Sequence, residues 1–408
     1  MAEYKDGGLI AKYIIHVIVA VLAMGIVVLS ALEAWRSITD FPQYYAAAKM
    51  YMAGDGANVY DENAISWVEH THFPKMKEEP VRFCFPPFSL PLFLPVGLLQ
   101  PNIAHYGWTI LSVIAFCLSS FTLRKTFDIP VKRAFWFVVL LPIMGPFCQS
   151  IIMGQPSFFL LLGLAGATFT LKRGHPYWAA LSMVALIPKP HLALPVCIFL
   201  LGARKFKTVF ALAGIGIILL ATTLLNPGFE AYVNYASFMK YANQHPEVMN
   251  LPGCVTIRTQ LLRFFPQFYE AVGIVSLGVF AGGLALLAWL GNKFKNRQDW
   301  LEIASLVSMP VGFVTTLYVH PYDLLLFLPS IFVFGFVLQN RVQTRPGMIP
   351  LCILMAVIFV FPVYVPAYFT KWPFYPLFWV VLAYAGLCVW NALRLPSETD
   401  KQKSELAA

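Results

Sequence analysis

Nine polar side chains lie within or beside the apolar segments of this chain, where charged groups are uncommon. They are Asp40, Gln155, Lys189, His191, Arg258, Arg263, His320, Tyr322 and Asp323. An ionisable side chain at membrane depth is costly unless it is paired or hydrated, so such residues are candidate functional groups. Whether these nine can form one polar chamber depends on the segments that position them.

Asp40 stands in the stretch "SITDFPQYYAAAKMYMAGDG", directly after the first long apolar run. Its carboxylate is suited to capping a helix, because Asp accepts hydrogen bonds from the first free N–H groups. Pro42 favours a first helical turn, and Gly54 favours a helix end. A capping role and a functional role are both open for Asp40 at this point.

The cationic candidates each have a structural alternative. Lys189 lies between two prolines, where a fixed ammonium can meet a phosphate, but a lysine can also snorkel to the membrane interface. His320 and Asp323 can form a pair at a helix end, with Asp323 capping the apolar segment that follows. Arg258 and Arg263 are five residues apart and share no helix face well, so at most one is expected to contact a ligand directly.

Two further pairs of residues give weaker signals. Tyr44 and Tyr45 belong to an aromatic stripe at helical spacing, which is more often an anchor in the membrane interface than a sugar-binding platform. We therefore expect this helix to lie along the outer interface. His70 and His72 have a spacing that can bind metal on a strand, but no third ligand is near, so no metal site is predicted.

The composition indicates an integral membrane protein. Of 408 residues, 59% are hydrophobic and only 12% are charged, and the mean hydropathy is +0.68. An average soluble domain has about 25% charged residues. The first apolar run, 13–32, is long enough to cross a bilayer and lacks a small-residue cleavage site, so we expect a retained helix.

The net charge of +9 is concentrated in five short connections between apolar runs. These connections hold fourteen basic and two acidic residues, at 124–133, 172–173, 204–207, 293–299 and 341–345. This bias is the positive-inside pattern and places the connections in the cytoplasm. No basic cluster is interleaved with aromatic residues on a soluble surface, so no nucleic-acid partner is predicted.

Apolar runs come in even numbers between the basic connections, and we count about twelve. They are 13–32, 106–123, 134–148, 157–171, 177–188, 192–202, 209–225, 272–290, 303–319, 324–338, 348–364 and 374–390. The prediction is an all-α polytopic membrane protein with both termini in the cytoplasm. One domain covers residues 1–395, with large external loops at 33–103 and 226–271, and a disordered tail covers 396–408. All nine polar candidates then fall on the external side.

Three apolar segments do not suit a straight crossing. The runs 177–188 and 192–202 are shorter than a normal span, so they are either short crossings or re-entrant helices. The segment 83–95, "FCFPPFSLPLFLP", carries four prolines. It is predicted to lie in or re-enter the outer interface, and a proline-kinked helix is the alternative.

Cysteine spacing and missing motifs exclude several classes of protein. No C-x-x-C pair occurs, which argues against a zinc or redox centre, although Cys84 and Cys254 both fall on the outer side and could pair. The chain has no Walker motif, no G-x-G-x-x-G after a strand and no H-E-x-x-H. Functions that depend on ATP, a dinucleotide or a protease zinc therefore lack support, and no cofactor is predicted.

Five blocks of the sequence, taken in order, resemble glycosyltransferase family 87. They are "DFPQYYAAAKMYMAGDGANVYD" (40–61), "FPPFSLPLFLP" (85–95), "GQPSFFLLLGL" (154–164), "PKPHLALP" (188–195) and "YVHPYDLLLFLP" (318–329). The resemblance runs over residues 13–329. One departure is Pro156, which follows the Gln of the "GQ" block where a polar residue such as Asn is common.

The resemblance implies a membrane glycosyltransferase of the C-superfamily, a group that includes a polyprenol-phosphate-mannose-dependent α-1,2-mannosyltransferase. The implied donor is a polyprenyl-phosphate sugar that approaches from the lipid bilayer. The implied acceptor is a glycolipid or glycan on the outer side, and the reaction inverts the anomeric carbon. We expect a monomer in the cell inner (plasma) membrane, with its active site on the periplasmic or extracellular face and no metal.

The resemblance also gives the candidate residues their roles. An acid of the first loop acts as general base in such enzymes, and in this chain that acid is Asp40. Lys189, His320 and either Arg258 or Arg263 are the candidates for the donor phosphate. The candidates for contact with the substrates are Tyr44, Tyr45, Gln155, His191, Tyr322 and Asp323.

Two other classes of function stay open. A secondary transporter or flippase for a lipid or small polar solute also has about twelve spans, broken helices and a polar cluster. Its cluster would lie near the midplane, and its sequence would show an inverted repeat. A structural or lipid-binding scaffold would not need a fixed acid at the membrane edge.

Overall fold

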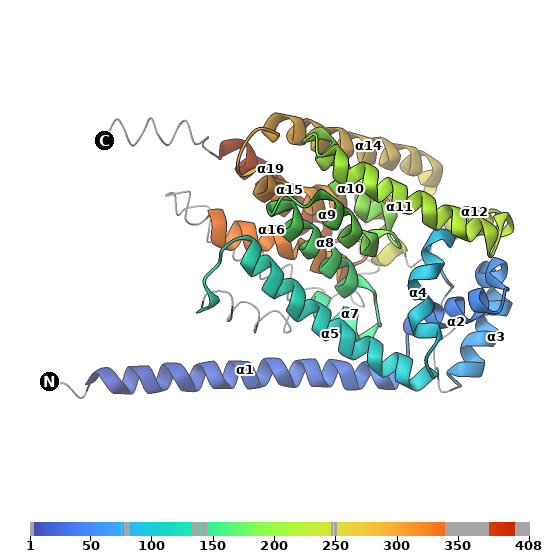
Figure 1. Ribbon diagram of the computed structural model, residues 1–408, viewed down its shortest axis with the longest axis horizontal. Coiled ribbons are helices and arrows are strands. Elements are labelled where there is room, and N and C mark those ends of the chain that lie inside the picture. Colours follow the sequence, from blue (N-terminus) through green and yellow to red (C-terminus); the bar gives the residue numbers. More distant parts are fainter. Residues whose placement is uncertain are drawn as a thin grey trace.

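The computed structural model describes residues 4–74, 76, 82–132, 135, 139, 145–245, 248, 251–338 and 375–395 of the chain. Over these residues the protein is helical and contains no strand, which confirms the predicted all-α class. Long helices extend lengthwise through the molecule, and several short helices gather at one end (Figure 1).

Five helices of the described part are long and apolar enough to cross a membrane. They are α1 (Tyr4–Ser37), α5 (Pro101–Thr126), α11 (Phe206–Leu225), α14 (Tyr269–Phe294) and α19 (Pro376–Arg394). Each of them contains a predicted apolar run or overlaps most of one. The chain is therefore a membrane protein, but the predicted count of about twelve spans is not confirmed.

The other predicted runs correspond to shorter apolar helices. These are α8 (Ser157–Lys172), α9 (Pro176–Met183), α10 (Pro190–Gly202), α15 (Trp300–Thr315) and the continuous series η7 (Pro321–Phe327), α16 (Leu328–Phe332) and η8 (Val333–Val337). The predicted run 348–364 and the tail 396–408 lie outside the described residues, as does most of the run 134–148. The break between η4 (Val184–Leu186) and α10 falls at the two prolines that flank Lys189, because a proline cannot continue a helix without losing a hydrogen bond.

The two predicted external loops fold into short helices at one end of the molecule. The first loop forms α2 (Phe41–Met52), η1 (Gly56–Tyr60), α3 (Glu62–His72), η2 (Pro87–Ser89) and α4 (Leu90–Gly97), and the second forms α12 (Phe229–Gln244), η5 (Leu251–Gly253), α13 (Ile257–Phe264) and η6 (Pro266–Phe268). The loops meet where the Asn234 side chain donates to the Ala57 carbonyl at 2.9 Å. Helix α1 begins and α19 ends at the opposite end of the molecule (Figure 1).

Helix α2 is buried inside this group of short helices. Ten of its twelve residues are buried, including both tyrosines of the aromatic stripe. Helix α4 packs so closely against it that a Cβ on Gly97 would lie 2.7 Å from the Cβ of Ala48. The expectation that the stripe anchors the helix in lipid is wrong, because protein covers both tyrosines. The position of this helix along the outer interface stays a prediction.

The proline-rich segment forms two short pieces. Pro87 starts the turn η2, and Pro91 lies in the first turn of α4, positions where a missing N–H is tolerated. Helix α4 has eight residues and contains Pro95. The segment is therefore not one long kinked helix, and its length does not suit a straight crossing.

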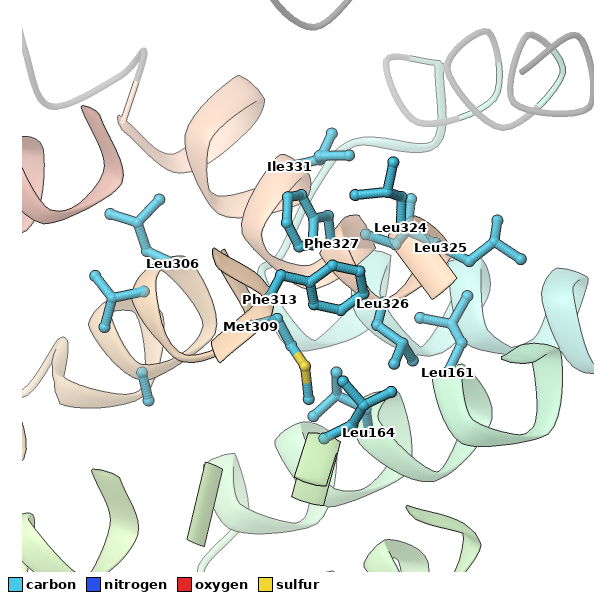
Figure 2. Close-up of a cluster of buried hydrophobic side chains, with 14 of the residues drawn as sticks. Leu161, Leu164, Leu306, Met309, Phe313, Leu324, Leu325, Leu326, Phe327 and Ile331 are labelled. Carbon is cyan, nitrogen blue, oxygen red and sulfur yellow. The ribbon is translucent and has the colours of Figure 1, made fainter. Parts of the chain in front are cut away.

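The long helices enclose an apolar core that fixes the element η7. Figure 2 shows Leu161 and Leu164 of α8, Met309 and Phe313 of α15 and Leu326 and Phe327 of η7 gathered in one cluster of buried side chains. The rings of Phe313 and Phe327 meet edge to face, with centroids 4.7 Å apart. A second core lies among the short helices around α2, and the candidate site is built where these two cores meet.

Candidate functional site

Asp40 lies at the junction between α1 and α2 and is half-buried. It occupies the position before the first helical residue, but its side chain makes no capping hydrogen bond. Instead, the Gln155 amide Nε2 donates to the Asp40 oxygen Oδ2. The capping role predicted for the side chain is therefore wrong, and the carboxylate is positioned by a residue 115 positions away in the sequence.

The loop that carries Gln155 connects α7 (Gly145–Ile152) to α8 and docks directly on Asp40. The Asp40 N–H donates to the Met153 carbonyl at 3.3 Å, and the Trp108 indole N–H donates to the Gly154 carbonyl at 2.8 Å. Gly154 has φ +64°, and a Cβ there would lie 3.0 Å from the Cβ of Phe41. Glycine is needed at this position both for its backbone conformation and for the close approach.

Tyr44 orients the amide of Gln155 from the other side. Its hydroxyl donates to Gln155 Oε1 at 3.3 Å, so the amide NH₂ is the group that faces Asp40. Burial raises the pKa of Tyr44 well above its usual value, and the nearby Asp40 carboxylate raises it further. The phenol therefore stays a neutral donor, and its ring is fixed by stacking on Phe93 with centroids 5.1 Å apart.

Lys189 and Asp323 form a buried ion pair in the same site as the Asp40 carboxylate. Lys189 Nζ lies 2.7 and 2.8 Å from the two carboxylate oxygens of Asp323, and the side chains are 6% and 2% exposed. Ser157 Oγ donates to the same carboxylate at 2.6 Å. Asp323 lies inside η7 and not before its first residue, and its carboxylate bonds to Ser157 and Lys189, so the alternative of a helix cap at Asp323 is not formed. An ion pair that is fully desolvated persists only when such additional hydrogen bonds satisfy its charges.

His320 places an imidazole ring close to the Lys189 ammonium. Its Nε2 lies 2.8 Å from the Tyr318 hydroxyl, and its ring centroid lies 5.0 Å from that of Tyr322. Lys189 Nζ lies 4.9 Å from the Tyr322 ring centroid. The His191 ring approaches Tyr318 edge to face at 6.3 Å. The structure thus brings together four of the predicted residues, Lys189, His191, His320 and Tyr322.

The Asp40 half and the Lys189 half belong to one site. Gln155, which holds Asp40, and Ser157, which holds Asp323, are two residues apart at the start of α8. Burial and, to a smaller extent, the Asp40 carboxylate raise the pKa of the Cys84 thiol to about 12, and the Lys189 ammonium acts in the opposite direction. Cys84 therefore lies within electrostatic range of both charges.

Three residues of the site were not predicted from the sequence. Ser157 and Tyr318 bond to Asp323 and His320, and Cys254 Sγ lies 3.9 Å from His320 Nδ1. The "GQPS" and "YVHPYD" blocks contained a signal for the first two, since each lies two residues from a predicted site residue. Cys84 and Cys254 are not joined by a disulfide, so the suggested pairing between them is not formed.

The two arginines lie in the second external loop. Arg258 Nη2 donates to the Tyr269 hydroxyl at 2.9 Å, and its charge lowers the pKa of Cys254, which burial has raised. Arg263 Nη2 donates to the Pro252 carbonyl at 2.6 Å. Arg258 is therefore linked to the neighbourhood of His320, while Arg263 belongs to a separate part of this loop.

Tyr45 and the two histidines of α3 lie away from Asp40, in the packing of the first external loop. The Tyr45 hydroxyl donates to the Leu99 carbonyl at 3.0 Å, and its ring meets His72 with centroids 5.2 Å apart. Tyr45 thus joins α2 to α3 and to the α4–α5 connection and is not brought to Asp40. His70 and His72 lie on a helix and not on a strand, and no group of three metal-ligating side chains occurs in the described ranges.

Chemically, the site joins an oriented carboxylate to buried cationic and phenolic donors. A half-buried carboxylate can accept a proton from a hydroxyl group, and its fixed orientation favours that transfer. An ammonium and an imidazole in a water-poor setting bind an anion more strongly than they would in water. The arrangement can therefore deprotonate an alcohol while it stabilises a departing anion.

Comparison with known proteins agrees with this chemistry. The model of glycosyltransferase family 87 matches residues 83–321 of the chain. The match includes Gln155, Ser157, Lys189 and His320, and it stops before Tyr322 and Asp323. Searches of curated proteins and of solved structures gave no match. Because the matched region covers more than half of the sequence, the chain belongs to glycosyltransferase family 87.

Proposed function

We propose that this glycosyltransferase moves a sugar, mannose, from a polyprenyl-phosphate donor to a hydroxyl group of a lipid-linked or glycan acceptor. The reaction takes place on the non-cytoplasmic face of the inner (plasma) membrane and inverts the anomeric carbon. The observation that carries the proposal is that Gln155 holds the Asp40 carboxylate while Ser157, two residues later, holds the Asp323 carboxylate that pairs with the buried Lys189. Mannose, the C-superfamily fold, the membrane side and a monomeric state rest on the resemblance and on loop charge.

Asp40 is the general base of the proposed reaction. It takes the proton of the acceptor hydroxyl while the hydroxyl oxygen attacks the anomeric carbon. The new glycosidic C–O bond forms as the bond from that carbon to the donor phosphate breaks, and the electron pair leaves with the polyprenyl phosphate. No strong general acid is needed, because the phosphate leaves as a stable anion, unlike the alcohol released by a glycosidase.

Lys189 and His320 hold the donor phosphate in this proposal. An ammonium group has three N–H donors, and the described contacts with Asp323 use two of them. The third can bond to a phosphate oxygen. The His320 ring and the Tyr318 hydroxyl are hydrogen-bonded to each other at 2.8 Å, so they can approach the same phosphate together. Arg258 adds positive charge from the second loop, and no metal is part of the mechanism.

The direct test is a transfer assay with purified protein, a polyprenyl-phosphate sugar and a cell-lipid extract as the source of acceptor. Wild-type protein is expected to form a new glycolipid, and Asp40→Asn is expected to lose at least about 100-fold in rate because the amide cannot take the proton. If Asp40→Asn transfers as fast as wild type, Asp40 is not the base. If no donor gives transfer while vesicles show substrate counterflow, the protein is a transporter and the proposal fails.

A further inference from the structure

A cavity of about 270 Å³ lies in the second external loop, outside the site of Asp40, Lys189 and His320. Its walls are mainly apolar, and they include Leu251, Pro252, Leu262 and Pro266 together with Arg263 and Tyr269. Arg263 is the charged side chain among these lining residues, and it stands in walls that are otherwise mainly apolar. This combination matches an amphiphile with an anionic head.

The position of the cavity relative to the bilayer supports a lipid ligand. Pro266 begins a 29-residue segment, Pro266–Phe294, that is apolar enough to span a membrane. Residues at the end of a span lie at the level of the lipid head groups. Next to Pro266 in the sequence, Phe264, Phe265 and Phe268 are 41%, 47% and 56% exposed, and they give an apolar surface that an acyl chain can cover.

Arg263 is held in a fixed orientation at this cavity. Its Nη2 donates to the Pro252 carbonyl at 2.6 Å, and its guanidinium carbon lies 4.6 Å from the centroid of the Tyr375 ring. A planar guanidinium can bond to two phosphate oxygens at once.

The size of the cavity limits what enters it. A volume of about 270 Å³ lies just below the range of pockets that hold drug-sized ligands, so the cavity has room for a phosphate and a few carbon atoms but not for a whole lipid. The remaining chain must therefore leave the cavity, and the exposed phenylalanines provide an apolar surface for it. Free phosphate is a poorer ligand, since most of its oxygens would face apolar walls.

We infer that this cavity binds the phosphate head group of a membrane lipid, at a second lipid site separate from the donor site around Lys189. The two sites share a loop, since Leu251 and Pro252 line the cavity while Cys254 contacts His320 and the Val255 N–H donates to Val319 at 2.8 Å. The inference goes beyond the proposed reaction and does not depend on which sugar is transferred.

The test measures binding to the purified full-length protein in a maltoside detergent, which contains no phosphate. Isothermal titration calorimetry is performed with dioctanoyl phosphatidic acid, dioctanoylglycerol and inorganic phosphate. The phosphatidic acid is expected to bind at least about tenfold more tightly than the other two. Equal binding of dioctanoylglycerol would overturn the role of the phosphate, and equal binding of inorganic phosphate would overturn the lipid as ligand.

Variants locate the binding. Arg263→Gln is expected to weaken phosphatidic acid binding about tenfold or more. Arg394→Gln is the matched control, because Arg394 also packs on an aromatic ring, that of Trp390 at 3.7 Å, but does not line the cavity. Leu262→Trp fills the cavity without removing Arg263, and its binding is expected to fall while its melting temperature stays near that of wild type. Unchanged binding in both cavity variants would overturn the inference.

Two variants of the donor site separate this result from the proposed function. Phosphatidic acid binding is expected to persist in Asp40→Asn and in the double variant Lys189→Met/Asp323→Leu, whatever these changes do to sugar transfer. If the double variant keeps its melting temperature but loses binding, and Arg263→Gln does not, the lipid binds at the donor site and the second site does not exist.

Discussion

Gln155 decides the orientation of Asp40, because its amide donates to the carboxylate while accepting from Tyr44. A general base loses efficiency when its direction is no longer fixed, and a misplacement of about 1 Å can lower a rate about 100-fold. Gln155 is therefore a positioning residue whose loss changes the chemical step more than binding of the donor.

Gln155→Leu is accordingly expected to lower kcat about 10- to 100-fold with little change in the donor KM. The matched control is Gln149→Leu on α7, because the Gln149 side-chain oxygen is buried and makes no hydrogen bond within the described residues. That variant should keep wild-type kinetics. Steady-state rates measured against donor concentration give both constants, and a Gln155→Leu enzyme with normal kcat and raised KM would contradict the positioning role.

The buried pair of Lys189 and Asp323 affects both the stability of the fold and the proposed binding of the donor phosphate. Removing one partner leaves an uncompensated buried charge, which typically costs about 3–5 kcal/mol, whereas replacing both by apolar residues is often neutral. Binding of a phosphate, however, depends on the positive charge of the Lys189 ammonium, which an apolar side chain of similar volume does not supply. Stability and activity should therefore respond differently to the single and the double change.

Lys189→Met and Asp323→Leu are each expected to lower the free energy of unfolding by about 3–5 kcal/mol, and the double variant is expected to recover most of this loss. All three are expected to lack transferase activity. Arg82→Gln is a control, since the exposed pair of Arg82 with Glu62 should contribute at most about 1 kcal/mol. Thermal unfolding in detergent measures stability, and an active double variant would show that Lys189 is only structural.

At the scale of elements, the α7–α8 connection is the part that joins the short helices to the long ones. Gly154 makes this possible, because it combines φ +64° with the close approach to Phe41. Gly174, in the α8–α9 connection, has φ +75° but no atom within 4 Å of its missing Cβ. The two glycines therefore separate the effect of backbone conformation from the effect of contact.

Gly154→Ala and Gly174→Ala are both expected to lose about 1–2 kcal/mol of stability from the left-handed conformation. Only Gly154→Ala is expected to lose activity as well, because the added methyl group pushes α2 and Asp40 away from Gln155. Melting temperatures and transfer rates of the two variants check this difference. Equal activities would mean that the contact with Phe41 does not set the position of Asp40.

The apolar runs, the breaks at prolines and most members of the site followed from the sequence, because hydropathy and turn residues act locally. The hydrogen-bond partners of the charged residues could not be predicted from the sequence. Asp40, Lys189 and Asp323 find their hydrogen bonds 115 to 166 residues away, and such pairings depend on how helices pack. The stripe of Tyr44 and Tyr45 misled for the same reason, since the neighbouring helices that bury it are not visible in its spacing.

At the scale of the whole molecule, the two ends differ in a way that loop charge anticipates. The short helices of the two predicted external loops lie at one end, and the start of α1 and the end of α19 lie at the other (Figure 1). The charge bias predicts that the first end faces outward. This orientation can be tested without any substrate.

A cysteine at Asn63 in α3 is expected to react with a membrane-impermeant maleimide in intact cells, and one at Lys207 only after permeabilisation. Both side chains are exposed. Wild-type protein is the background control and should label weakly, because burial raises the pKa of Cys84 to about 12 and keeps it a thiol. The opposite labelling pattern would invert the predicted topology.

The spacing of Gln155 and Ser157 has a mechanical consequence. Gln155 and Ser157 lie within one turn of backbone. Gln155 holds Asp40, the proposed general base, and Ser157 holds Asp323, which neutralises Lys189 at the proposed phosphate site. The two charges therefore cannot drift independently, and any shift of α8 displaces both by a similar amount. The separation between the proposed general base and the proposed phosphate-binding lysine is therefore fixed by the two-residue spacing of Gln155 and Ser157.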